Sequence, residues 1–185
     1  AHPGAPRGRT GRDGYTGARP HRPAVPELKT MTTDSTIWKP HVVTATIVER
    51  DGRYLFVEES IDGRTVINQP AGHLDHHETL LDCARRETLE ETGWTVEPTA
   101  LTGVYLLETE IPGKTFLRFC FAARAVSFDA ARPLDKEIVR THWWNRDELL
   151  LRQGEHRSPL VLRALDDHLA GQRYPLAMLH DFLRD

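Results

Sequence analysis

Three glutamates near the middle of the chain, Glu87, Glu90 and Glu91, are spaced so that they could act together. In a helix, residues three and four positions apart lie on one side, so these carboxylates would crowd one another. Like charges in this arrangement destabilise a helix unless a positive group lies among them. Arg85 and Arg86 offset part of the charge, and a divalent cation would offset more. Carboxylate oxygens suit Mg²⁺ or Mn²⁺, which commonly bind through a few carboxylates together with substrate phosphates.

A loop, a helix and a second loop are predicted to position these glutamates. Gly72 closes a tight turn, Glu78 and Thr79 begin a helical pattern, and Gly93 follows as a residue that commonly ends helices. The opposite side of this helix should face a core through Leu80, Leu81, Ala84 and Thr88. The chemistry would therefore lie on one helix side and the packing on the other.

The spacing of this stretch resembles the sequence box of the Nudix hydrolases. That box has a glycine, five residues, a glutamate, seven residues, Arg-Glu, two residues, Glu-Glu, one residue, a glycine and an apolar residue. The matching positions are Gly72, Glu78, Arg86, Glu87, Glu90, Glu91, Gly93 and Trp94. Thr88 departs from the aliphatic residue that the family prefers, but this is a packing position. The alternative interpretation is a solvated acidic helix, and the many matched positions argue against a chance match.

The composition predicts one domain with a basic N-terminal extension. A chain of 185 residues can bury a substantial core. Residues 1–31 are rich in Gly, Pro and Arg and carry a net charge of +4, which leaves −7 for the rest of the chain. We expect this segment to be a disordered extension or tag, or alternatively a basic arm that binds a partner. Residues 37–185 are expected to form the single domain.

Several classes of protein are disfavoured by the same composition. No apolar run is long enough to span a membrane, and an acidic body does not favour nucleic-acid binding. Two cysteines, Cys83 and Cys120, do not make a disulfide framework, and we expect buried free thiols in a reducing cytoplasm. The expected partner is a small di- or triphosphate, bound by a monomer or homodimer.

The strand predictions depend on β-branched and aromatic runs separated by turn residues. Asp51-Gly52 and Asp62-Gly63 each predict a hairpin turn. The predicted strands are 41–50, 53–60, 64–68, 100–110, 115–126 and 140–144, of which 115–126 is the longest pattern. Trp143 and Trp144 occupy adjacent strand positions, so they should point to opposite faces of a sheet, with one of them in the core.

Three further helices are predicted after the last strands. Asn145 and Glu148 fit the two ends of a capping box. Ser158-Pro159 would begin a helix that runs to Gly171, and 175–183 is expected to form a short last helix. Strands and helices alternate irregularly, which predicts a mixed sheet with helices on both faces.

The resemblance implies the same α/β/α sandwich and extends over about residues 37–182. Within the family it points to the NudJ-type phosphatases of bacteria, through segments such as 38–41, 68–74 and 157–161. Such enzymes remove terminal phosphate from nucleoside tri- and diphosphates and act on thiamine diphosphate and its pyrimidine diphosphate precursor. The resemblance therefore implies an Mg²⁺-dependent phosphatase in which Mn²⁺ can substitute.

The resemblance also implies roles for residues of the box. Glu87, Glu90 and Glu91 are expected to bind the metal, with the backbone carbonyl of Gly72. Arg86 is expected to hold a glutamate in register by pairing with Glu78 or with a metal-binding glutamate. Glu78 is then structural.

Two parts of the chain could supply the general base. It is a box glutamate, Glu90 or Glu91, or an acidic residue from a later loop, for which Glu137 is the candidate. The alternative for Glu137 is a solvated loop charge. The carboxylate of a general base must come within about 3 Å of the attacking water, and sequence spacing does not reveal this distance.

Substrate contacts are predicted from residue type. Arg118 and Arg64 offer guanidinium donors for phosphate, or alternatively form surface ion pairs. Trp38, Phe116 and Tyr105 could stack on a substrate ring, although aromatic residues on strands more often pack in a core. His41 and His73 are assigned to the substrate side or to structure rather than to the metal.

Three functions remain in competition. The first is the phosphatase described above. The second is a pyrophosphohydrolase of the same fold that releases pyrophosphate or cleaves ADP-ribose or dinucleotides. The third is a nucleotide-sensing module without catalysis, which the intact set of glutamates disfavours.

Overall fold

A computed structural model describes residues 37–183, so the prediction for residues 1–31 lies outside the described part. The fold is built on a sheet of seven strands with helices packed against it. The strands are β1 (His41–Arg50), β2 (Arg53–Ile61), β3 (Arg64–Asn68), β4 (Ala71–His73), β5 (Trp94–Glu108), β6 (Thr115–Phe128) and β7 (Ile138–Trp144). The helices are α1 (Leu80–Thr92), α2 (Arg146–Leu150) and α3 (Leu160–Leu169), with 3₁₀ turns η1 (Gln153–Glu155) and η2 (Leu176–Met178).

The sheet is mixed, as predicted. Its main path runs β3-β2-β1-β6-β5, with β4 paired to β1 and β7 paired to β2. The β1–β6 pair is parallel and the others are antiparallel. Both predicted hairpin turns are present, and Asp51, Gly52, Asp62 and Gly63 all have positive φ angles, which suits Asp-Gly in tight hairpins.

The first two strands separate like a fork soon after their turn. They pair with each other only at Glu49–Tyr54 and Arg50–Arg53. Farther along, β1 pairs with β4 while β2 pairs with β7 and β3. The link from β3 to β4 runs through this fork, where the amide of Thr46 donates to the carbonyl of Pro70 at 3.0 Å. The fork thus carries the chain from the hairpin β2–β3 to the start of the acidic box.

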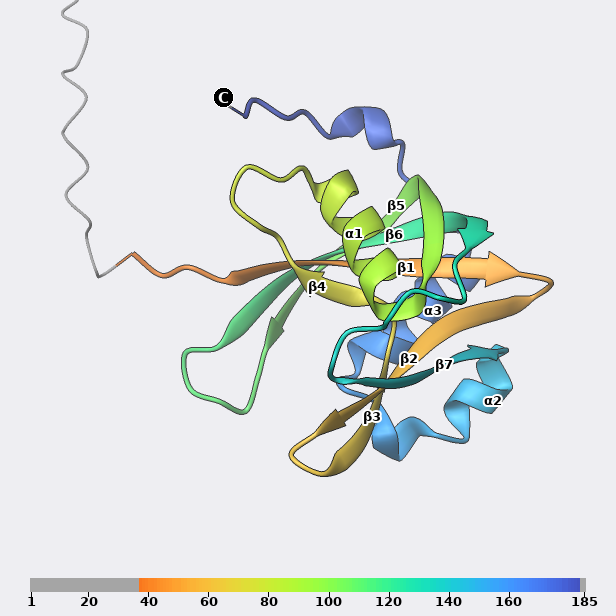
Figure 1. Cartoon of the computed structure of the whole chain (residues 1–185). Coiled ribbons are helices and arrows are strands. Elements are labelled where there is room, and N and C mark those ends of the chain that lie inside the picture. The colour runs from red at the N-terminus through yellow and green to blue at the C-terminus, as the bar shows by residue number, and fades with distance from the viewer. Residues whose placement is uncertain (1–36, 184–185) are drawn as a thin grey trace, which may run out of the picture. The chain divides into compact units, whose positions relative to one another are not determined.

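Helix α1 covers one face of the sheet (Figure 1). The side-chain contacts beneath it are polar as well as apolar. The hydroxyl of Thr44 donates to Sγ of Cys83 at 3.1 Å, and the hydroxyls of Thr46 and Thr88 share a hydrogen bond of 2.7 Å. Thr88 also donates to the carbonyl of Ala84 at 2.7 Å. A hydroxyl at position 88 therefore has buried partners, which explains how the chain accommodates the departure from an aliphatic residue.

Helices α2 and α3 lie on the opposite face, over an apolar core. Strand side chains alternate between faces, so Ile47 and Cys120 point away from α1 and join Phe56, Val161 and Leu165 in one cluster. Each of these five side chains is at most 1% exposed. Burial of this apolar surface is the main source of stability on this face.

Two details differ from the sequence predictions. Strand β5 begins at Trp94, directly after α1, and with 15 residues it is longer than the 14 residues of β6. It pairs with β6 over nearly its whole length, so long-range pairing extends it beyond its local pattern. The predicted helix 175–183 is wrong, because only the single 3₁₀ turn of η2 forms there.

Other predictions are confirmed. Trp143 packs against Val48 and Leu55 while Trp144 packs against the cluster on the α3 face, so the two rings point to opposite faces. The capping box of Asn145 and Glu148 is present, and Cys83 and Cys120 are free and buried. No helix among residues 37–183 has both the length and the apolar character needed to cross a bilayer.

Candidate active site

Helix α1 has defined ends that fix the register of its glutamates. The hydroxyl of Thr79 accepts a hydrogen bond from the amide of Asp82 at 3.1 Å and caps the N-terminus. Gly93 ends the helix with a φ of 72°, a left-handed conformation that glycine adopts at little cost. The loop, helix and loop predicted for the box are therefore observed.

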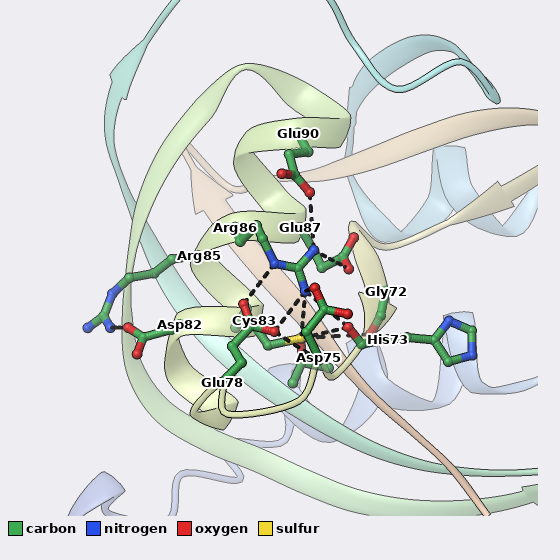
Figure 2. Close-up of polar contacts among 12 residues, drawn as sticks. Gly72, His73, Asp75, Glu78, Asp82, Cys83, Arg85, Arg86, Glu87 and Glu90 are labelled. Atoms are coloured by element: carbon green, nitrogen blue, oxygen red, sulfur yellow. Dashed lines mark hydrogen bonds and ion pairs between the residues drawn. The ribbon is translucent and has the colours of Figure 1, made fainter. Parts of the chain in front are cut away.

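Arg86 lies at the centre of the acidic side of α1 (Figure 2). Its Nε and Nη2 donate to the two carboxylate oxygens of Glu78 at 2.7 and 2.8 Å. Its Nη1 donates to Glu87 at 2.7 Å and to Glu90 at 3.1 Å. The hydrogen bonds from Arg86 hold the pKa of Glu78 below its usual range. One guanidinium thus holds three carboxylates that would otherwise repel one another.

Three carboxylates come close enough together to share one cation. Oxygen atoms of Glu87, Glu90 and Asp135 lie within 4.8 Å of one another. Asp135 comes from the loop before β7, and its amide donates to the carbonyl of Glu90 at 3.1 Å, which ties that loop to α1. The sequence reasoning missed Asp135. Asp135 lies two residues before Glu137 in the same acidic loop, and this proximity could have pointed to it. No local feature of the sequence favoured Asp135 over Glu137 as a site residue.

Gly72 provides room for one of these carboxylates. A Cβ atom built at this position would lie 1.9 Å from Cδ of Glu87, so any other residue here would displace the Glu87 carboxylate. The carboxylate of Glu87 therefore rests directly against the backbone of β4. Oxygen ligands of this kind and number suit a hard divalent cation, so the residues fit the metal that the sequence led us to expect.

Glu91 is held apart from this group. Its Oε2 accepts a hydrogen bond from the amide of Ala71 at 2.9 Å, and its exposed fraction is 9%. Burial raises the pKa of Glu91 to about 9, against the opposing effect of the Ala71 amide. Without a cation nearby, Glu91 therefore keeps its proton at neutral pH. A cation would favour the ionised form, so metal binding would release a proton here.

A hollow of about 320 Å³ opens beside Glu91. It is lined by Glu91 and by the consecutive loop residues Asp135, Lys136, Glu137 and Ile138. The loop is fixed on its other side, where the carbonyl of Glu137 accepts from the amide of Ser60 at 3.0 Å. The hollow brings carboxylates from α1 and from the loop to one space, together with one lysine that could contact phosphate.

Arg118 does not present its guanidinium to solvent. It is 5% exposed, and it donates to Oε1 of Gln69 at 2.9 Å and to Oδ1 of Asn68 at 3.3 Å. Arg118 also points to the face away from α1, because it is two residues from Cys120 on the same strand and so shares its face. Arg64, by contrast, is exposed on β3.

The predicted ring contacts separate into two groups. Phe116 packs beside His41 and His73 with ring centroids 5.3 and 6.0 Å away, next to the box, and Trp38 is 57% exposed. Tyr105 instead packs against the core on the α3 face and donates to Asp167 at 2.9 Å. Of the two alternatives considered for Tyr105, the structure shows core packing, because strand alternation turns its ring to the α3 side.

Comparison with known proteins places this geometry in a family. The model of the NUDIX domain matches residues 38–165, which include the whole box. The chain belongs to the Nudix family. Its Nudix relatives include Phosphatase NudJ from Escherichia coli K12, 41% identical over 147 residues, which cover 79% of this chain and 94% of the relative.

Solved structures agree with this assignment. A Nudix hydrolase from Nitrosomonas europaea is 45% identical with a TM-score of 0.76, over 78% of this chain and 98% of that one. An ADP-ribose pyrophosphatase from Streptococcus suis is 17% identical with a TM-score of 0.55, over 74% of this chain and 96% of that one, and shows the fold alone. The chain is therefore a Nudix hydrolase that acts on phosphorus-containing anhydrides.

Proposed function

We propose that this Nudix hydrolase removes the terminal phosphate from nucleoside tri- and diphosphates and from thiamine-type diphosphates, with Mg²⁺ as its cofactor. The observation that carries the proposal is the group of carboxylates from Glu87, Glu90 and Asp135 beside the hollow that Glu91 lines. The similarity to Phosphatase NudJ supports terminal phosphate as the leaving product.

The metal-binding residues that we propose are Glu87, Glu90 and Glu91 with the carbonyl of Gly72, extended by Asp135 from the loop. A bound divalent cation neutralises phosphate charge and makes a coordinated water a stronger nucleophile. Mn²⁺ has the same preference for oxygen ligands and is expected to substitute.

The remaining residues position the substrate and the proton acceptor. Arg86 orients Glu87 and Glu90 through the hydrogen bonds described above, so we propose that it acts on the metal site indirectly. Glu137 and Glu91 both line the hollow, and we propose one of them as the general base. Phe116 and Trp38 are the proposed ring contacts, and Arg64 remains a proposed phosphate contact.

A phosphate-release screen tests this proposal. The full chain is incubated with nucleoside tri- and diphosphates and with thiamine diphosphate and its pyrimidine diphosphate precursor, with and without Mg²⁺. Orthophosphate released in successive steps only when Mg²⁺ is present supports the proposal. Pyrophosphate as the first product from a nucleoside triphosphate would instead identify a pyrophosphohydrolase.

A matched pair of variants separates chemistry from folding in the same assay. Glu87→Gln removes one charge of the carboxylate group, whereas Glu97→Gln removes an exposed charge from β5. We expect Glu87→Gln to abolish nearly all release and Glu97→Gln to retain it. Tight nucleotide binding without any metal-dependent release by the wild-type protein would instead indicate a sensing module.

A further inference from the structure

Arg118 carries a charge that is almost fully removed from water without an ion pair. Its two hydrogen-bond acceptors are the neutral side-chain oxygens of Asn68 and Gln69. Within residues 37–183 no carboxylate pairs with it, and its Nε is buried without a hydrogen-bond partner. Burying a charge among neutral groups lowers stability, and an apolar residue of similar volume is often at least as stable there. Stability alone therefore does not account for an arginine at this position.

The acceptors of Arg118 belong to the segment that leads into the box. Asn68 is the last residue of β3, and Gln69 follows it within the fork between β1 and β2. Gln69 is 1% exposed, and its Nε2 donates to the carbonyl of Val161 in α3 at 2.7 Å. Gln69 is thus held from two sides, by Arg118 and by the backbone of α3.

The same segment contacts the glutamates of α1 only two residues later. The amide of Ala71 donates to Glu91 at 2.9 Å, and the carboxylate of Glu87 rests against the backbone of Gly72. In the same segment, the carbonyl of Pro70 accepts a hydrogen bond from the backbone amide of Thr46 in β1. Residues 68–72 therefore connect a buried charge on the α3 side of the sheet with two carboxylates on the α1 side.

We propose that Arg118 is a positioning residue for the metal-binding glutamates. It fixes Asn68 and Gln69, and through the segment 68–72 it sets where the carboxylates of Glu91 and Glu87 lie. This inference rests on the proposed function, because it concerns glutamates to which that function gives a metal-binding role. It gives Arg118 an indirect role in place of a direct contact with phosphate.

The variant Arg118→Lys tests this role in the full chain. Lysine keeps the charge but lacks the planar guanidinium group that donates to two acceptors at once. The affinity for Mn²⁺ alone is measured by electron paramagnetic resonance, and kcat and KM are measured for phosphate release. Loss of a group that orients metal ligands commonly lowers metal affinity or activity by about 10- to 100-fold. We expect losses of this size in Mn²⁺ affinity and kcat, with KM changed by less than about threefold.

A second variant approaches the same hydrogen bond from its other end. Gln69→Leu removes the acceptor for Arg118, and we expect Mn²⁺ affinity and kcat to fall in the same way. Because both variants break one chain of contacts, the double variant should lose no more than the worse single variant. Gln69→Leu also keeps the test decisive if Arg118→Lys fails to fold.

Two controls separate positioning from general destabilisation. Arg124→Lys changes an exposed arginine on the same strand, and Ile47→Val shortens a core side chain outside the segment 68–72. Thermal unfolding is measured for all variants. If Arg118→Lys and Gln69→Leu lower the melting temperature as Ile47→Val does but leave Mn²⁺ affinity and kcat unchanged, the proposal is overturned. A rise in KM alone would overturn it too, because Arg118 would then contact substrate directly.

The Mn²⁺ measurement keeps this inference distinct from the proposed function. A wild-type protein that binds Mn²⁺ but releases no phosphate would refute the proposed function. The comparison of Mn²⁺ affinities between the wild-type protein and the variants would still decide whether Arg118 positions the glutamates.

Discussion

The two faces of the sheet hold their helices by different kinds of contact. On the α1 face, hydroxyl and thiol groups of Thr44, Thr46, Cys83 and Thr88 pair beneath the helix, and the charged residues of the box lie above them. On the α3 face, apolar side chains around Leu165 fill most of the core, and ion pairs lie at its rim. The buried polar contacts of that face include those of Arg118 and Gln69.

This difference separates the source of chemistry from the source of stability. Hydrogen-bonded pairs have strict distances and directions, so they fix the rotation and height of α1 and hence the positions of its carboxylates. Apolar contacts are non-directional and contribute in proportion to buried area. We therefore expect substitutions on the α1 face to change activity most, and substitutions of apolar residues on the α3 face to change stability most.

The largest effect is expected from Glu91→Gln. The substitution keeps the shape of the side chain but removes a charge to which we give a metal-binding role. Turnover should fall by about 1,000-fold, the size commonly seen when one electrostatic contact to a transition state is lost. Phosphate release under saturating substrate and Mg²⁺ measures it. Activity near that of the wild type would break the comparison, because the buried carboxylate on α1 would then have no part in the chemistry.

The stability of the wild-type protein and of Glu91→Gln should depend differently on pH. Burial raises the pKa of Glu91 to about 9 in the folded, metal-free protein, above the ordinary value of about 4.3 in the unfolded chain. Between about pH 4.3 and about pH 9, the folded state binds more protons at Glu91 than the unfolded state does. The free energy of unfolding of the wild type therefore falls as pH rises through this range. Glu91→Gln removes this loss. Urea unfolding without metal should show little difference at pH 5 and a more stable variant at pH 8.

Leu165→Ala addresses the α3 face. Leu165 is fully buried in the core cluster of that face, so the truncation should lower the free energy of unfolding by about 2–5 kcal/mol. Because the cavity lies on the side of the sheet away from α1, kcat per folded molecule should stay close to that of the wild type. Denaturant unfolding and kinetics below the melting temperature check this, and a large fall in kcat would contradict the separation of the faces.

Arg86→Met tests the charged cluster itself. Removing the guanidinium leaves Glu78, Glu87 and Glu90 without their shared partner, so the free energy of unfolding should fall by about 1–3 kcal/mol in metal-free protein. Added Mg²⁺ should recover part of this loss, since it supplies positive charge to the same carboxylates. Arg85→Met is the matched control, because Arg85 pairs with Asp82 and Glu97 outside the group.

The smallest effect is expected at the hydroxyl pair beneath α1. Thr88→Val leaves the buried hydroxyl of Thr46 without its partner and should cost about 1–2 kcal/mol. Replacing both threonines by valine removes both polar groups, so the double variant should recover most of that loss. Thermal unfolding of the single and double variants forms the test. Additive losses would show that the hydroxyl pair does not act as a unit.

The parts of the molecule that sequence could predict are those decided by near neighbours. The ends of α1, the two Asp-Gly hairpins and the capping box of Asn145 depend on residues a few positions apart, and all were predicted. The pairing of Arg86 with Glu90 follows from their spacing of four residues on one helix. The pairing of Arg86 with Glu78, eight positions earlier and before the helix, was also predicted.

The parts that could not be predicted depend on contacts across the fold. Arg118 meets Asn68 and Gln69, about fifty residues earlier in the chain, and nothing local shows that these amides remove its charge from water. Asp135 reaches Glu90 through a backbone hydrogen bond that no side-chain pattern encodes. The choice between stacking and core packing for Tyr105 was left open, because the register of a strand fixes its faces only once its neighbours are known.

The loop before β7 is attached by its main chain at both ends of the hollow. The amide of Asp135 bonds to α1 and the carbonyl of Glu137 bonds to β2, so neither link depends on a side chain. Side chains in this loop can therefore be exchanged while its path is retained. Natural or designed relatives could acquire new substrate preferences by changing position 136, without rebuilding the scaffold that carries the box.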